Sequence, residues 1–126
     1  MTQARVLVVE DNVKNMKLFR DVLEAAGFHT LAATTGGEAV EVAAEQAPDL
    51  VLMDIQLPDF DGVEALGRLR ANERTAGTRV VALTAQAMEG DRERFLAAGF
   101  DGYLSKPVDI PDFVATVRRH CAESGP

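Results

Sequence analysis

Apolar residues are arranged along the chain in five short runs, each followed by a longer segment in which they recur at helical spacing. The runs cover residues 5–9, 28–33, 50–53, 79–83 and 102–104. Short continuous apolar runs are typical of strands that are buried on both faces, and the intervening segments are long enough for crossover helices. The pattern therefore predicts an α/β domain in which five βα units form a doubly wound parallel sheet.

Glycine marks several boundaries of the predicted helices. We expect Gly27 and Gly99 to cap the C-terminal ends of the first and fourth helices, since glycine tolerates the left-handed conformation that is common there. The fourth helix is expected at about 89–98. Gly36-Gly37, before the second helix, is interpreted as a plain turn, and residues 58–62 as the loop before the third helix.

Polar residues interrupt the pattern where four of the strands end. The residues at these places are Glu10, Asp11, Asp54, Thr84 and Lys106. In an open parallel sheet, the carboxyl ends of the strands border a crevice at a topological switch point. We therefore expect these side chains to meet there. A solvated strand end, with Asn12 as a helix cap, would explain the first two residues alone but not the whole set.

Three carboxylates in one crevice favour a bound cation. Two carboxylates about 4 Å apart repel by about 4 kcal/mol at an effective dielectric constant of about 20, and oxygen ligands suit Mg²⁺. Asp54 can act as a nucleophile that accepts a phosphoryl group as an acyl phosphate. Lys106 would neutralise the phosphoryl charge, Thr84 would donate a hydrogen bond, and the small Ala85 would leave the approach open.

Composition and charge narrow the class of protein. The 126-residue chain fits one domain, predicted to span residues 1–126 with a core at about 5–121. A net charge of −7 argues against nucleic-acid binding. Without a long apolar stretch or a signal peptide, no membrane insertion is expected, and the default location is the cytoplasm. The single cysteine, Cys121, agrees with a reducing compartment.

Five motifs, in this order, closely resemble the receiver domain of two-component response regulators, the CheY-like superfamily. They are Glu10-Asp11-Asn12, Met53-Asp54-Ile55-Gln56-Leu57-Pro58, Gly62, Ala82-Leu83-Thr84-Ala85 and Tyr103-Leu104-Ser105-Lys106-Pro107. The resemblance extends from residue 5 to about 121 and is greatest for stand-alone, single-domain regulators. The alternative is a receiver domain excised from a hybrid histidine kinase or a multidomain effector, since such receivers share many of the same motifs. The resemblance implies a flavodoxin-like (βα)5 fold with strand order 2-1-3-4-5.

The resemblance also implies a role for each polar residue. Asp54 would be the phosphoacceptor, and Mg²⁺ would be bound by Glu10, Asp11, Asp54 and the backbone carbonyl of Gln56. Lys106 would pair with the phosphoryl group, Thr84 and Ala85 would lie beside it, and Tyr103 would rotate inward as Thr84 moves. The Lys106–Pro107 bond is expected to be cis, which proline allows at low cost. Gln56 and Gln86 are expected to modulate the rate of dephosphorylation.

Two kinds of protein partner follow from the same resemblance. A histidine kinase or a histidine phosphotransfer protein would dock near Asn12, Asn15 and Leu18 and on the loop after Thr84. A downstream protein would bind the face built from residues 89–98, 102–104 and 109–121. The chain would then be a switch without an output domain, capable at most of self-phosphotransfer and autodephosphorylation.

An enzymatic alternative is a small phosphohydrolase that uses Asp54 as its nucleophile. Many such enzymes place a second aspartate, the general acid, two residues after the nucleophile. Gln56 occupies that position here, and an amide cannot protonate a leaving group. The sequence therefore favours the switch over the enzyme.

Overall fold

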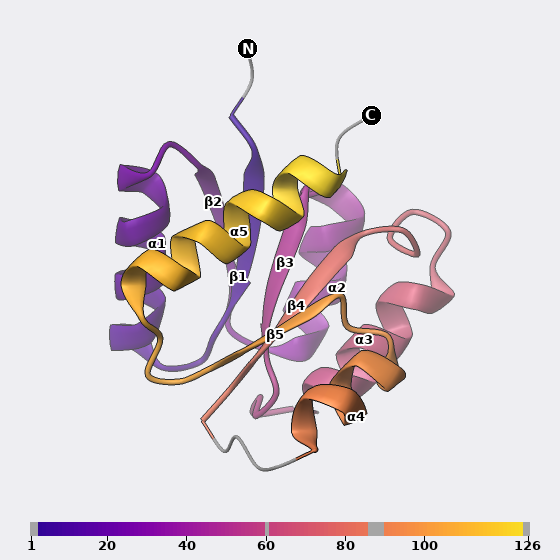
Figure 1. The fold of residues 1–126 in the computed structure, drawn as a ribbon. Coiled ribbons are helices and arrows are strands. Elements are labelled where there is room, and N and C mark those ends of the chain that lie inside the picture. The colour runs from indigo at the N-terminus through magenta and orange to yellow at the C-terminus, as the bar shows by residue number, and fades with distance from the viewer. Residues whose placement is uncertain (1–2, 60, 86–89, 125–126) are drawn as a thin grey trace.

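The computed structural model describes residues 3–59, 61–85 and 90–124, and its centre is a five-stranded parallel sheet (Figure 1). The strand order is β2-β1-β3-β4-β5, which confirms the predicted fold class. The strands are β1 (Arg5–Val9), β2 (His29–Ala33), β3 (Leu50–Asp54), β4 (Arg79–Thr84) and β5 (Gly102–Ser105). Their ends differ by no more than one residue from the predicted ones.

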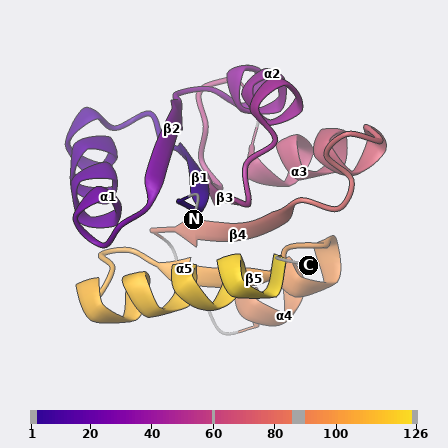
Figure 2. The same ribbon diagram turned by 90° about the horizontal axis from the view of Figure 1, so that it is seen from above.

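A helix follows each strand, and the helices cover both faces of the sheet. They are α1 (Val13–Ala25), α2 (Gly36–Gln46), α3 (Gly62–Ala71), α4 (Asp91–Ala98) and α5 (Ile110–Ser124). Helices α1 and α5 lie on one side of the sheet, and α2 and α3 lie on the other (Figure 2). Two apolar layers result, one around Phe19 and Phe113 and the other around Leu66, Leu69 and Phe95.

The inner strands are apolar because neither of their faces reaches water. Every residue of β3 is buried, and only the first residue of β1 and of β4 is partly exposed. The edge strands β2 and β5 are more exposed. The continuous apolar runs in the sequence therefore reflect the two helical layers, as expected for a parallel sheet.

Side chains and glycines define the ends of several helices. Asn12, Thr35 and Asp61 each accept a hydrogen bond from the backbone N–H three residues later, at the start of α1, α2 and α3. Gly27 and Gly99 have positive φ angles of 99° and 115° just after α1 and α4, so the predicted C-terminal glycine caps are confirmed.

One local prediction is wrong. Gly36 and Gly37 are the first two residues of α2 rather than a plain turn. Thr35 and Glu38 match the spacing of a capping box, a helix-start signal that outweighs the poor helix propensity of two glycines. The predicted start of α4 at residue 89 lies outside the described residues.

Among the described residues, none of the helices combines the length and hydropathy that crossing a lipid bilayer would require.

Candidate functional site

The polar strand ends meet at one edge of the sheet because of the pairing of its central strands. β1 pairs with β3 so that Val9 lies opposite Met53. Glu10, which follows β1, therefore lies beside Asp54, the last residue of β3. β4 pairs with β5 on the other side, and the Lys106 N–H donates to the carbonyl of Thr84 at 2.7 Å. Residues separated by almost the whole chain therefore border one crevice.

Lys106 joins two buried carboxylates in this crevice. Its Nζ donates to Glu10 Oε1 at 2.5 Å and to Asp54 Oδ2 at 3.0 Å. Glu10 is 1% exposed and Asp54 is 5% exposed. Buried carboxylates without a cation would be strongly destabilising, so Lys106 acts as the internal counter-ion of the site.

The surroundings change the proton affinity of both ends of the Glu10–Lys106 pair. Burial, together with the hydrogen bond and the charge of Asp54, raises the pKa of Glu10 more than Lys106 lowers it. Burial lowers the pKa of Lys106, but its bonds to Glu10 and Asp54 outweigh this effect and leave that pKa above its usual value. Lys106 is therefore a cation at neutral pH.

An acidic cluster suited to a metal ion surrounds this pair. Glu10, Asp11 and Asp54 each offer a carboxylate oxygen, and these oxygens lie within 4.8 Å of one another. Asp11 is exposed, whereas the other two are buried. Hard oxygen donors at the mouth of a crevice fit Mg²⁺, which keeps several waters and commonly takes only a few protein ligands. The residues present therefore fit this ion.

The loop after β3 turns tightly around Asp54. The Gln56 N–H donates to Asp54 Oδ1 at 3.0 Å, and the Gly62 N–H donates to the carbonyl of Ile55 at 2.8 Å. A Cβ atom on Gly62 would lie 2.7 Å from the backbone oxygen of Asp54. Gly62 thus permits the close turn that brings exposed Gln56 to the crevice.

The crevice has a volume of about 440 Å³. Exposed Ala85 borders it, and Thr84 beside it is 5% exposed. Its lining residues are Glu10, Asp11, Asn12, Asn15, Asp54, Gln56, Leu57, Pro58, Ala85 and Lys106. The space is open to solvent and large enough for a phosphoryl group and a hydrated cation.

Comparison with known proteins agrees with this geometry. The family model for the response regulator receiver domain matches residues 6–118. The chain belongs to this family. Receiver domains are signalling modules that interact with histidine kinases and downstream targets, and they bind Mg²⁺ at an acidic site.

Individual relatives cover nearly the whole chain. The polar-differentiation response regulator DivK of Brucella ovis is 44% identical over 119 residues, which are 94% of this chain and 97% of DivK. The receiver domain of the sensor histidine kinase PA1611 from Pseudomonas aeruginosa is 35% identical, with a TM-score of 0.88 over 96% of this chain and 99% of that one. The chemotaxis regulator CheY4 of Vibrio cholerae is 26% identical, with a TM-score of 0.87 over 94% of this chain and 99% of that one.

The predicted kinase-docking residues of this receiver lie along the start of α1. Asn12 caps α1, and Asn15 lines both the crevice and an adjoining cavity of about 420 Å³. Leu18, which is 44% exposed, lines the same cavity beside Lys106 and Pro107. An apolar hollow therefore opens directly next to the phosphoacceptor candidate.

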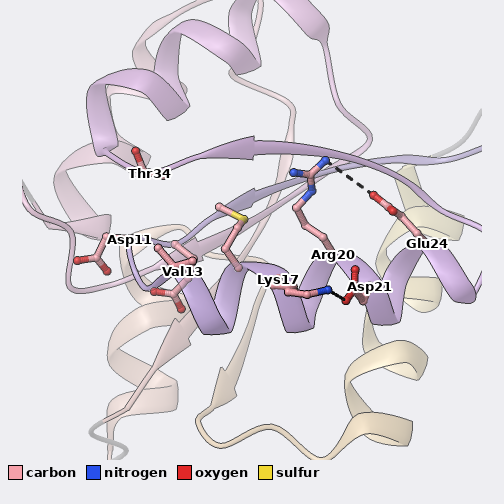
Figure 3. Close-up of a pocket in the computed structure, with 9 residues that line it drawn as sticks. Asp11, Val13, Lys17, Arg20, Asp21, Glu24 and Thr34 are labelled. Carbon is pink, nitrogen blue, oxygen red and sulfur yellow. Dashed lines mark hydrogen bonds and ion pairs between the residues drawn. The ribbon is translucent and has the colours of Figure 1, made fainter.

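A second hollow, of about 450 Å³, runs along the other flank of α1 from Asp11 to Glu24 (Figure 3). Two of its carboxylates, both on α1, are paired with cations of the same helix: Lys17 contacts Asp21 at 2.6 Å and Arg20 contacts Glu24 at 3.8 Å. These exposed pairs contribute little to stability.

Tyr103 lies on β5, at the edge of the receiver sheet. It is half-buried, and its ring packs on Phe95 of α4 with a centroid distance of 5.7 Å. Strand β5 therefore contacts α4 through an aromatic pair. The Lys106–Pro107 bond is cis, as expected, whereas Gln86 lies outside the described residues.

Sequence reasoning overlooked Asp59. The sequence predicts only a loop at this position, whereas the Asp59 carboxylate accepts hydrogen bonds from two N–H groups at the start of α2. The available signal was the capping-box spacing of Thr35 and Glu38, which marks a helix N-terminus that attracts anionic side chains. Even so, the pairing of that helix with Asp59 follows only from the tertiary structure.

Proposed function

We propose that Asp54 accepts a phosphoryl group from a phosphohistidine, and that the chain acts as a response regulator in a two-component system or phosphorelay. The observation that carries the proposal is the position of Asp54 between Lys106, at 3.0 Å, and the carboxylates of Glu10 and Asp11. A nucleophile next to a fixed cation and an acidic metal cluster suits phosphoryl transfer, which depends on positioning and charge neutralisation.

The transfer exchanges one bond to phosphorus for another. A carboxylate oxygen of Asp54 would bond to phosphorus while the bond from phosphorus to the histidine nitrogen breaks. The bonding electrons would leave with the imidazole, and Asp54 would become an acyl phosphate. When bound, Mg²⁺ would supply positive charge beside the phosphoryl oxygens.

Each protein group would have a defined task in this step. Glu10, Asp11, Asp54 and the backbone carbonyl of Gln56 would hold the metal ion. Lys106 would bind a phosphoryl oxygen, and the Thr84 hydroxyl would donate a hydrogen bond to another. The PA1611 receiver domain, solved with a magnesium ion coordinated in its active site cleft, supports the choice of metal.

Phosphorylation would shift an existing equilibrium between two conformations. Thr84 would move towards the phosphoryl group and Tyr103 would rotate inward. The face of α4, β5 and α5 would then bind a downstream protein, while α1 residues Asn12, Asn15 and Leu18 would receive the phosphodonor. The 44% identity to DivK supports a DivK-like regulator, for which a cytoplasmic location is part of the proposal.

Incubation with acetyl phosphate and Mg²⁺, followed by intact mass spectrometry, tests the proposal. One phosphoryl group should be added to the wild type, and none to Asp54→Asn or in the presence of EDTA. Asp61→Asn is the matched control, because it changes an aspartate of the neighbouring loop while asparagine can still cap α3. Labelling that persists in Asp54→Asn would overturn the assignment.

A further inference from the structure

Asp59 ties the loop between β3 and α3 to the start of α2. Its Oδ1 accepts from the N–H of Gly36 at 2.8 Å, and its Oδ2 accepts from the N–H of Gly37 at 2.9 Å. Thr35 accepts from the N–H of Glu38 at 3.0 Å. The first three N–H groups of α2, which have no partner within the helix, are therefore all bonded.

The contact is specific for a carboxylate. Two oxygens match two adjacent N–H groups, and a negative charge is favoured at the positive end of the helix dipole. A Cβ atom on Gly37 would already lie 3.4 Å from Asp59 Oδ2, so the carboxylate packs directly against the helix backbone. Asp59 and Gly36 are 23 positions apart in the chain, so the bond joins two separate segments.

The same loop borders the metal site on its other side. At its base, the Gly62 N–H donates to Ile55, and the Ile55 N–H donates to the carbonyl of Leu83 at 2.9 Å. Three positions before Asp59, Gln56 contacts Asp54 and lines the crevice. The described part of the loop is thus held at its base by the sheet and further out by α2.

We propose that Asp59 is a positioning residue for the metal site: by binding the start of α2, it fixes the loop so that the backbone of Gln56 is held ready to ligate Mg²⁺. The inference rests on the proposed function, because it requires the crevice to hold that ion. Asp59 is neither among the crevice-lining residues nor part of the acidic cluster, so it acts through the loop.

A purely structural role would have a different signature. If Asp59 only capped α2, its removal would lower the melting temperature and leave the metal affinity unchanged. If it positions Gln56, its removal would weaken Mg²⁺ binding, because part of the binding free energy would be used to order the loop. The dissociation constant for Mg²⁺ therefore separates the two roles.

The test measures Mg²⁺ binding to the metal-free protein by isothermal titration calorimetry, with thermal melting in parallel. Asp59→Ala should raise the Kd by about 10-fold, the lower end of the range for residues that position metal ligands. Asp59→Asn, which keeps one acceptor oxygen, should give an intermediate Kd and still decides the question if the alanine variant does not fold. Thr35→Ala, which weakens the start of α2 but leaves the loop bond in place, should change the Kd less than about 2-fold.

Asp61→Asn controls for charge, since it removes a carboxylate from the same loop without touching α2. The inference is supported if only the Asp59 variants weaken binding. It is overturned if Asp59→Ala melts lower with the wild-type Kd, or if Asp61→Asn weakens binding equally. If the wild type itself binds no Mg²⁺, the proposed function fails as well, and this result is distinct from the other two.

Discussion

Replacing Asp11 by asparagine should stabilise the protein without metal and destabilise it relative to the wild type with metal. Asp11 is the exposed member of the acidic cluster, and its carboxylate lies within 4.8 Å of those of Glu10 and Asp54. Lys106 offsets one of these two buried charges. Asp11 therefore faces about one uncompensated negative charge.

The size of the repulsion follows from this separation. At the outer limit of this separation, 4.8 Å, two like charges repel by about 0.9 kcal/mol at the dielectric constant of water and by about 3.5 kcal/mol at a value near 20. The lower figure applies because Asp11 is exposed, and salt reduces it further. In metal-free buffer, Asp11→Asn should thus raise the free energy of unfolding by roughly 0.5–1 kcal/mol, which corresponds to an increase of roughly 2–4 °C in melting temperature.

Magnesium should reverse this order. At a free concentration of 100 times the wild-type Kd, binding stabilises the wild type by about 2.7 kcal/mol. A variant that has lost one carboxylate ligand and binds about tenfold more weakly would gain only about 1.4 kcal/mol. The difference exceeds the metal-free advantage of the variant, so the two melting curves should exchange places.

Differential scanning fluorimetry in EDTA and in excess Mg²⁺ measures both halves of the prediction. Glu73→Gln is the matched control, because it removes one exposed carboxylate from the turn after α3 and so changes the net charge equally. The reasoning is refuted if Asp11→Asn melts at or below the wild type in EDTA. It is equally refuted if Glu73→Gln produces the same stabilisation and the same loss with Mg²⁺.

Three further predictions concern the buried part of the site. Asp54→Asn should change metal-free stability less than Asp11→Asn, because it also removes the attraction of Lys106 at 3.0 Å; urea unfolding compares the two variants. A raised pKa of Glu10, above the usual 4.5, contributes stability below about pH 4.5 that is lost as pH rises through the folded-state value. The stability of Glu10→Gln relative to the wild type should therefore rise as the pH increases above about 4.5, and a difference independent of pH would contradict this. Gly62→Ala should cost about 1–3 kcal/mol, because its Cβ would lie 2.7 Å from Asp54 O, whereas Gly67→Ala on the same helix meets nothing within 4 Å and should be neutral or stabilising.

The fold and the membership of the site were largely predictable from position in the sequence. The inner strands are apolar along their length because helices cover both faces, so their ends are visible as the first polar residues after each run. Parallel strands bring those ends to one edge of the sheet. The sequence alone therefore groups Glu10, Asp54 and Lys106.

The bonds within the site were not predictable in the same way. Lys106 and Glu10 are 96 positions apart in the chain. Whether Lys106 contacts both buried carboxylates depends on how deep each side chain lies in the crevice. The same holds for Asp59, because Gly36 and Gly37, the residues that it binds, have poor helix propensity and conceal the true start of α2 in the sequence. In both cases a long-range contact determines the local structure.

The charges in the crevice indicate the order in which the divalent cation and the phosphoryl group would bind. Glu10, Asp11, Asp54 and Lys106 together carry a net charge of about −2, so a divalent cation would bring the total close to zero. A phosphoryl group on Asp54 would then add about one negative charge, and Lys106 would be drawn from Glu10 towards it. Metal binding should therefore precede phosphorylation, since the reverse order would place the phosphoryl group in a site that already repels it.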